Sequence, residues 1–128
     1  MQPAREDLVD LLLSLTPDDQ HVIAKRMFGQ LGLFVNGNMY AGVHEGAIVL
    51  RLTDDDLAEL LAIDGARPFE PMGRLMREYA CVPASMVDDL DELESWLARS
   101  LAYARSLPPR AMRRPVPTTQ PQTQARAS

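Results

Sequence analysis

Residues 27–53 constrain the fold of this chain more than any other segment. Two turn signals, Asn36-Gly37 and Glu45-Gly46, divide the segment into three apolar runs. An Asn-Gly pair between apolar runs favours the tight turn of a β-hairpin, because both positions of that turn require positive φ angles. In the third run, the larger apolar residues Ile48, Leu50 and Leu52 alternate with Ala47, Val49 and Arg51, as on the two faces of a strand. The segment therefore predicts three antiparallel strands joined as a meander.

Helical patterns flank this meander. In residues 5–15, leucines recur at intervals of three and four, which is typical of the apolar face of a helix. Thr16-Pro17 then predicts a second, short helix through Lys25, because threonine caps helices and proline suits the first helical position. Thr53 predicts the cap of a further helix that ends near Gly65. The three aspartates after Thr53 are interpreted as first-turn carboxylates rather than as a metal site.

The remaining chain predicts two more strands, one long helix and a tail. Residues 67–70 and 77–82 have strand patterns, and Ser85 is expected to cap the longest helical region. The predicted order is helix, three strands, helix, two strands and helix. It fits an α+β fold in which helices pack on one side of a single antiparallel sheet of about five strands. We expect residues 1–107 to form one domain. Residues 108–128, which are rich in Pro, Gln and Arg, are expected to form a disordered tail.

Charge is divided unevenly between the domain and the tail. The whole chain carries a net charge of −5, the tail has four arginines and no acids, and residues 1–107 therefore carry −9. An acidic body repels phosphate backbones, so the tail is the part that favours contact with nucleic acid.

Several features point to the cytoplasm. Cys81 is the only cysteine, so it has no internal disulfide partner and suits a reducing compartment. The N-terminus has acids where a signal peptide needs a basic region followed by an apolar run. The longest apolar stretches fall well short of the roughly 20 residues that a membrane helix needs. We expect a cytoplasmic location and no membrane partner.

The sequence offers few groups for catalysis or for metal binding. The only histidines, His21 and His44, have no recognised ligand spacing with Cys81. Cys81 lies in an alternating strand, where a buried inert thiol and a redox-active thiol are both open interpretations. Gly29 and Gly32 stand before a hairpin, so they indicate a bulge or a close backbone approach rather than a nucleotide site. We expect no enzymatic activity, no cofactor and no metal.

Three stretches of the first half carry a family resemblance. They are Lys25-Arg26-Met27-Phe28-Gly29, Gly32-Leu33-Phe34-Val35 and Gly37-Asn38-Met39-Tyr40-Ala41. Together they resemble the opening motif of the TfoX (Sxy) N-terminal domain family, and the likeness extends over roughly residues 20–107. The motif positions that the resemblance marks are Arg26, Met27, Phe28, Gly29, Gly32, Phe34 and Gly37.

The resemblance implies a fold and a class of function. It implies an α+β domain without catalytic residues. Among the motif positions, Arg26 is the exposed candidate for a contact with a partner. Full-length members of the family regulate natural competence and assist a cyclic-AMP receptor protein at promoters. They also have a C-terminal helical domain. We expect this chain to be a stand-alone version of the N-terminal domain.

Three hypotheses about function remain open. The first is a non-enzymatic regulatory module that docks a protein of the transcription or chromosome machinery, through a sheet edge or the apolar residues near Met27. The second is DNA binding led by the arginines of the tail. The third is a small-ligand or redox-responsive protein built on the strands of Cys81 and His44. A homodimer is also open, because exposed sheet edges invite pairing.

Overall fold

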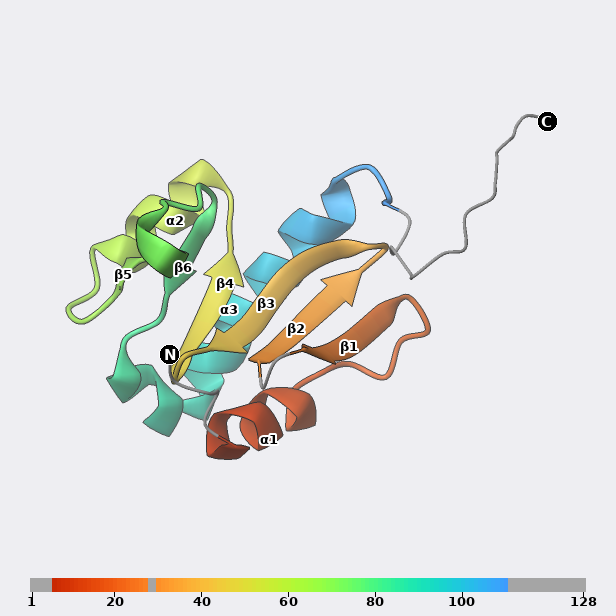
Figure 1. Cartoon of the computed structure of the whole chain (residues 1–128), viewed down its shortest axis with the longest axis horizontal. Helices are drawn as coiled ribbons and strands as arrows, with labels where there is room; N and C mark the ends of the chain where they lie inside the picture. Colours follow the sequence, from red (N-terminus) through yellow and green to blue (C-terminus); the bar gives the residue numbers. More distant parts are fainter. Residues whose placement is uncertain (1–5, 28–29, 111–128) are drawn as a thin grey trace.

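The computed structural model describes residues 6–27 and 30–110, and a six-stranded antiparallel sheet forms its centre (Figure 1). The strand order is β1-β2-β3-β4-β6-β5. Three α-helices accompany the sheet in the described ranges, which confirms the α+β class. The strands are β1 (Val22–Met27), β2 (Gln30–Val35), β3 (Asn38–His44), β4 (Ala47–Arg51), β5 (Arg67–Pro68) and β6 (Tyr79–Cys81). The helices are α1 (Glu6–Ser14), α2 (Asp54–Leu61) and α3 (Leu90–Ser106).

The predicted meander is present as β2, β3 and β4. Both of its turns have positive φ at their two central residues: Asn36 and Gly37 at 51° and 82°, and Glu45 and Gly46 at 48° and 80°. These angles match the two-residue hairpin turns that follow the right-handed twist of a sheet. The two turn signals in the sequence therefore located both hairpins.

The short helix predicted from Thr16-Pro17 is wrong, because this part of the chain forms a sixth strand, β1. The Thr16 hydroxyl bonds back to the carbonyl oxygen of Leu12 at 2.9 Å, so this residue ends α1 and does not begin a helix. His21 lies in the turn before β1, where its N–H donates to the carboxylate of Asp19 at 2.8 Å. Val22 then pairs with Val35 of β2, and pairing along β2 overrides the local capping signal.

The caps of the two later helices differ in how well the sequence predicted them. Thr53 caps α2 as expected, and its hydroxyl accepts from the N–H of Asp56 at 3.2 Å. Ser85, by contrast, lies inside a 3₁₀ helix, Ala84–Asp88, and the cap of α3 is Asp89. The carboxylate of Asp89 accepts from the N–H of Glu92 at 3.2 Å. A carboxylate at this position also suits the positive end of the helix dipole.

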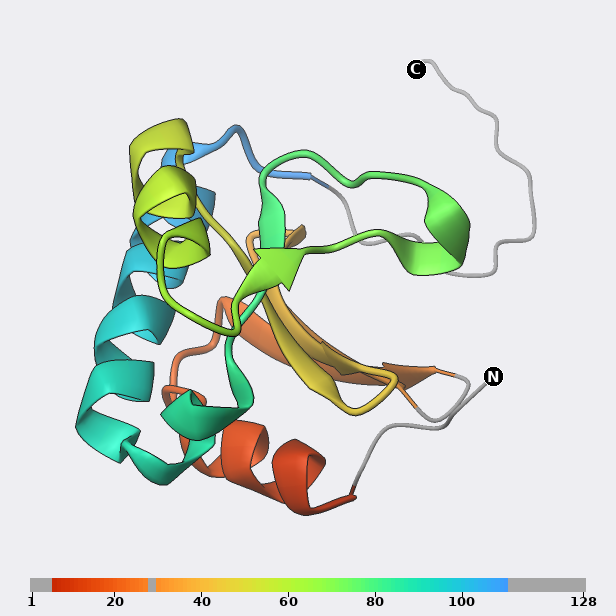
Figure 2. The same cartoon turned by 90° about the vertical axis from the view of Figure 1, so that its left-hand side faces the viewer.

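The helices cover one face of the sheet, as predicted (Figure 2). The core lies between that face and α1 and α3, and it is closed by side chains from all the central strands. Fully buried examples are Leu12, Leu33, Tyr40, Ile48, Leu50, Leu60 and Leu93. On the other side of the sheet, Figure 2 shows none of the three α-helices, only the projecting loop between β5 and β6, which contains the short 3₁₀ helix Pro71–Gly73.

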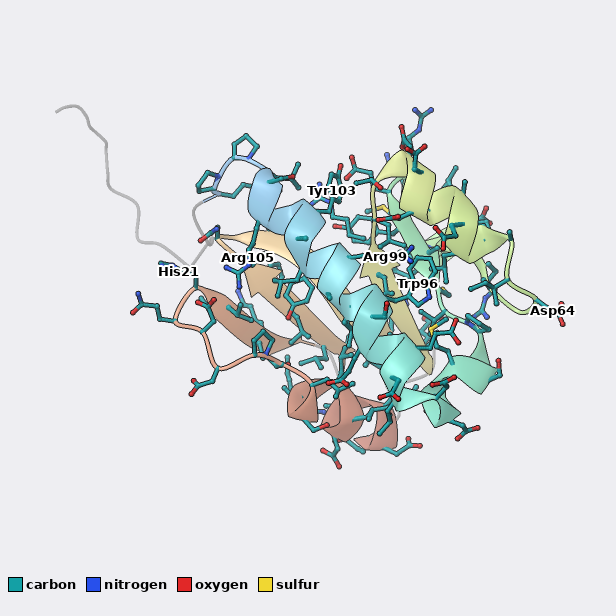
Figure 3. All side chains as sticks on the ribbon, turned by 180° about the vertical axis from the view of Figure 1, so that it is seen from behind. His21, Asp64, Trp96, Arg99, Tyr103 and Arg105 are labelled. Atoms are coloured by element: carbon teal, nitrogen blue, oxygen red, sulfur yellow. The ribbon has the colours of Figure 1, made fainter. Side chains whose placement is uncertain are left out.

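Polar contacts anchor α3 to its surroundings. The buried Ser100 hydroxyl bonds to the backbone oxygens of Tyr40 and Arg51, the latter at 2.8 Å. Arg99 lies over the Trp96 ring, 4.2 Å from its centroid, and pairs with Glu59 of α2 at 3.1 Å (Figure 3). These contacts join α3 to the sheet on one side and to α2 on the other.

No helix in the described ranges is both long enough and apolar enough to cross a membrane.

Candidate functional site

The face of the sheet opposite the α-helices, called the open face below, is depressed at its centre. The register places Lys25 of β1 opposite Gly32 of β2, Gly32 opposite Gly42 of β3, and Gly42 opposite Val49 of β4. Two facing glycines leave no side chain on the middle strands at this level. The row therefore forms a depression between Lys25 on one side and Val49 on the other.

A hollow of about 320 Å³ occupies this depression. We call it the glycine hollow. Apart from Lys25, Gln30 and His44 at its margins, its lining consists of apolar side chains and glycine backbone. The lining residues are Lys25, Gln30, Leu31, Gly32, Met39, Gly42, Val43, His44, Val49 and Phe69. An apolar concavity of this kind is where a protein accepts an apolar group.

Close contacts explain why both floor positions are glycine. A Cβ atom on Gly42 would lie 2.5 Å from the backbone oxygen of Leu31 and 2.9 Å from the methyl group of Met39. A Cβ atom on Gly32 would lie 2.9 Å from the ring of Phe34. At Gly42 the obstacle is backbone, which has little room to move. At Gly32 it is the far end of a side chain that can shift.

A β-bulge brings the two glycines together. Counted from the Asn36-Gly37 turn alone, Gly32 would face Ala41, but the register shifts between Leu33 and Phe34. The shift leaves one extra residue in β3 and moves Gly42 opposite Gly32. The glycine hollow therefore depends on this bulge as well as on the two glycines.

Residues 69–78, called the crossover loop, project on the open side (Figure 2), and Phe69 at the start of this loop lines the glycine hollow. The Phe69 ring packs edge-on against His44 with a centroid distance of 5.1 Å. The N–H of Met76 donates to the Phe69 carbonyl at 2.9 Å and closes the loop. The tip carries three exposed apolar side chains: Met72, Leu75 and Met76.

A second hollow of about 400 Å³ lies beyond Phe69 and His44, and its lining is more polar. It is lined by Arg67, Glu45, Glu70 and Cys81, among others. Cys81 is only 4% exposed, and burial raises the pKa of its thiol, partly offset by the charge of Arg67. A buried thiol with a raised pKa is a weak nucleophile.

The chain leaves α3 and attaches to the β2–β3 turn. The Asn38 amide donates to the carbonyl of Pro108 at 3.0 Å, and the N–H of Arg110 donates to the carbonyl of Asn36 at 2.8 Å. A Cβ atom on Gly37 would lie 1.6 Å from the backbone oxygen of Arg110. The attached chain thus extends three residues past the boundary expected at residue 107, and residues 111–128 lie outside the described ranges.

The structure separates the predicted motif residues into different places. Gly32 and Phe34 belong to the glycine hollow and its border, whereas Gly37 serves the turn. Arg26 lies on the helix side, where its guanidinium pairs with Glu6 of α1 at 2.7 Å. Met27 ends β1 opposite Gln30. Phe28 and Gly29 lie outside the described residues.

Sequence reasoning did not identify several residues of the glycine hollow, notably Lys25, Met39, Gly42, Val49 and Phe69. Gly42 could have been noticed as a second strand glycine, but the bulge that aligns it with Gly32 has no clear sequence signal. Phe69 reaches the hollow through a loop whose path depends on β6. Within residues 6–27 and 30–110, no three histidine, cysteine or acidic side chains are grouped as metal ligands would be.

Comparison with known proteins gives one match. The sequence model of the TfoX N-terminal domain matches residues 14–104, which is most of the chain. A search among curated proteins found no match.

Proposed function

Because this chain belongs to the TfoX N-terminal domain family, which is related to competence and regulatory proteins, we propose that it is a regulatory module without enzymatic activity. It binds a partner protein through the open face of its sheet. The partner belongs to the transcription or chromosome machinery, as the family relation suggests.

The observation that supports this proposal most strongly is the apolar character of the open face. The glycine hollow lies beside the crossover loop, whose tip exposes Met72 completely and Leu75 to 54%. Contiguous apolar surface on a small domain marks a site of interaction with another molecule. Arg26, the contact candidate of the family motif, pairs with Glu6 on the helix side and does not belong to this face, so its expected role stays a prediction.

The chemistry of the described residues also favours binding over catalysis. Covalent catalysis needs a nucleophile with a base in hydrogen-bonding reach. The thiol of Cys81 is buried with a raised pKa, and the ring of His44 packs against Phe69. A redox role for Cys81 stays a prediction, and loss of partner binding after thiol alkylation would support it.

Met39→Gln tests the proposed surface. This change keeps the side-chain length but places an amide at the wall of the glycine hollow. We expect retention of the partner by immobilised full-length protein to fall about fivefold or more, because a buried apolar contact contributes about 1–2 kcal/mol. Quantitative capture from the native lysate, with nuclease present, measures the effect.

Leu90→Gln is the matched control. Leu90 is 48% exposed on α3, on the opposite side of the sheet, so this variant should retain as much partner as the parent protein. Equal retention by parent and Met39→Gln proteins, both shown to be folded, would contradict the proposed surface. Retention that disappears with nuclease and with removal of residues 111–128 would instead favour nucleic-acid binding by the tail.

A further inference from the structure

We infer that the partner segment that docks in the glycine hollow is acidic, with a large apolar side chain between its carboxylates. This inference rests on the protein-binding function proposed above, and it adds the chemistry of the partner. It follows from how the basic side chains are distributed over the two sides of the sheet.

The described basic residues fall into two groups. Four arginines are paired with acids: Arg26 with Glu6, Arg51 with Glu78, Arg99 with Asp56 and Glu59, and Arg105 with Asp19. The others make no ion pair within the described ranges, and they are Lys25, Arg67, Arg74, Arg77 and Arg110. Despite the excess of acids, this second group of cations thus has no ion pair to any of the described residues.

The cations without ion pairs are gathered around the open face. Lys25 lines the glycine hollow, and Arg67 lines the polar hollow next to it. Arg74 and Arg77 are exposed in the crossover loop, which projects on the same side of the sheet. Arg110 comes after α3 and is bonded through its backbone to the β2–β3 turn, and its charge lowers the pKa of Tyr79 against the larger effect of burial.

Few described acids share this side of the molecule. Glu45 and Glu70 line the polar hollow beyond Phe69 and His44, and Glu78 is paired with Arg51. The other described acids belong to α1, α2, α3 and the segments that flank these helices. Among the described residues that line the glycine hollow, Lys25 is the only lysine, arginine or carboxylate.

This arrangement complements one kind of ligand. An apolar side chain fits against Gly32, Gly42 and Met39, where the hollow offers few polar groups. A carboxylate on one side of that anchor reaches the Lys25 ammonium, and one on the other side reaches the arginines of the crossover loop. Ion pairs at the border of an apolar surface are stronger than those in open water, because the surroundings are less polarisable.

The charges disfavour two other occupants. The chain's own residues 111–128 contain three arginines and no acid, so they do not complement the cations of the open face. Nucleic acid is disfavoured by the net charge of −5, which repels a phosphate backbone over a distance. A second copy remains an outcome for the test, because Leu90 is exposed between Asp89 and Asp91.

The test is a selection of displayed random 12-residue peptides on the immobilised full chain, with fluorescein-labelled dT12 as the nucleic-acid probe. We expect the selected peptides to combine several acids with a leucine, methionine or aromatic residue. Their affinity should fall about fivefold in the double variant Lys25→Gln/Arg74→Gln, since each exposed ion pair contributes up to about 1 kcal/mol. Affinity should also fall as salt is raised, because salt screens exposed charges.

The matched control is the double variant Ser95→Glu/Ala102→Glu. It changes the net charge by the same amount at two exposed positions of α3, so it should bind the selected peptides as the parent does. An equal loss in both double variants would mean that only total charge matters, and it would overturn the inference.

Each remaining outcome also decides the question. The selected peptides could be neutral or basic and still lose affinity in Met39→Gln. That result would overturn the inference of an acidic partner but would support the docking surface. Peptides unaffected by Met39→Gln, or no peptides at all, would count against the surface itself. If dT12 bound more tightly than the selected peptides, the cations of the open face would be assigned to nucleic-acid binding. Self-association that Leu90→Gln removes would assign the docked segment to a second copy.

Discussion

Individual residues set the detailed shape of the β2–β3 hairpin. The register shift between Leu33 and Phe34 leaves Tyr40 without a direct partner in β2, and its side chain lies in the core, 2% exposed. Burial raises the pKa of Tyr40 to about 12, because the phenolate would lose its hydration there. The nearby charge of Arg105 offsets part of this effect.

The raised pKa of Tyr40 predicts a loss of stability in alkali. The unfolded tyrosine releases its proton near pH 10 and the folded one near pH 12, so the folded state holds the proton more tightly. The stabilisation is complete below pH 10 and is lost as the pH rises from 10 to 12. Between pH 8 and 11 the free energy of unfolding should fall by about 1.4 kcal/mol from this residue alone.

Urea unfolding of the parent and of Tyr40→Phe at both pH values measures this contribution. The variant should lose less stability between the two pH values, because phenylalanine has no proton to release. Identical losses in the two proteins would show that Tyr40 keeps an ordinary pKa. Tyr79 and Tyr103, whose pKa values are also raised by burial, remain in both proteins and cancel in the comparison.

At the scale of elements, strand pairing determined secondary structure where local sequence signals predicted it wrongly. The residues from Thr16 to Lys25 have a capping pattern, yet β1 forms because Val22 and its neighbours pair along the whole of β2. Gly32 and Gly42 face each other in the β2–β3 ladder, and the absence of side chains at this pair leaves the glycine hollow. Lys25 and Met39 border this hollow. The fold and the candidate site therefore share the same pair of strands.

Alanine substitutions at the two floor glycines should have unequal costs. Gly42→Ala places a methyl group against the backbone oxygen of Leu31, so we expect it to lower the free energy of unfolding by about 2–3 kcal/mol. Gly32→Ala meets only the movable ring of Phe34, and its cost should stay below about 1 kcal/mol. Denaturant unfolding of both variants measures the difference. A larger loss for Gly32→Ala would contradict the close approach at Gly42.

At the scale of the whole molecule, the two sides of the sheet differ in packing and in charge. The helix side encloses the core and holds most of the described acids, with Arg99 and Arg105 of α3 paired to them (Figure 3). The open side carries the glycine hollow, the polar hollow next to it and cations that form no ion pair with the described residues. The end of the described chain connects the two, because Pro108 and Arg110 pass from α3 to the β2–β3 turn.

Two truncations test where the folded unit ends. Ending the chain after Arg110 should leave the melting temperature unchanged, because the bonds to Asn36 and Asn38 remain. Ending it after Leu107 removes both hydrogen bonds, which should cost about 1–3 kcal/mol and lower the melting temperature by several degrees. Calorimetry on the two proteins provides the measurement. Equal melting temperatures would mean that residues 108–110 add nothing to the fold.

The sequence by itself determined the family, the α+β class, both turns of the meander and the cap of α2. Each of these depends on short-range chemistry: Asn36 and Gly37 accept positive φ, and Thr53 supplies an oxygen to the first turn of α2. Only the tertiary structure decided that β1 is a strand, that Arg26 pairs with α1, and that Gly32 faces Gly42. These features depend on long-range pairing and on a one-residue bulge, which local preferences do not encode. The open face is also a tertiary feature, because the α-helices pack on one side of the sheet and leave the other side without an α-helix.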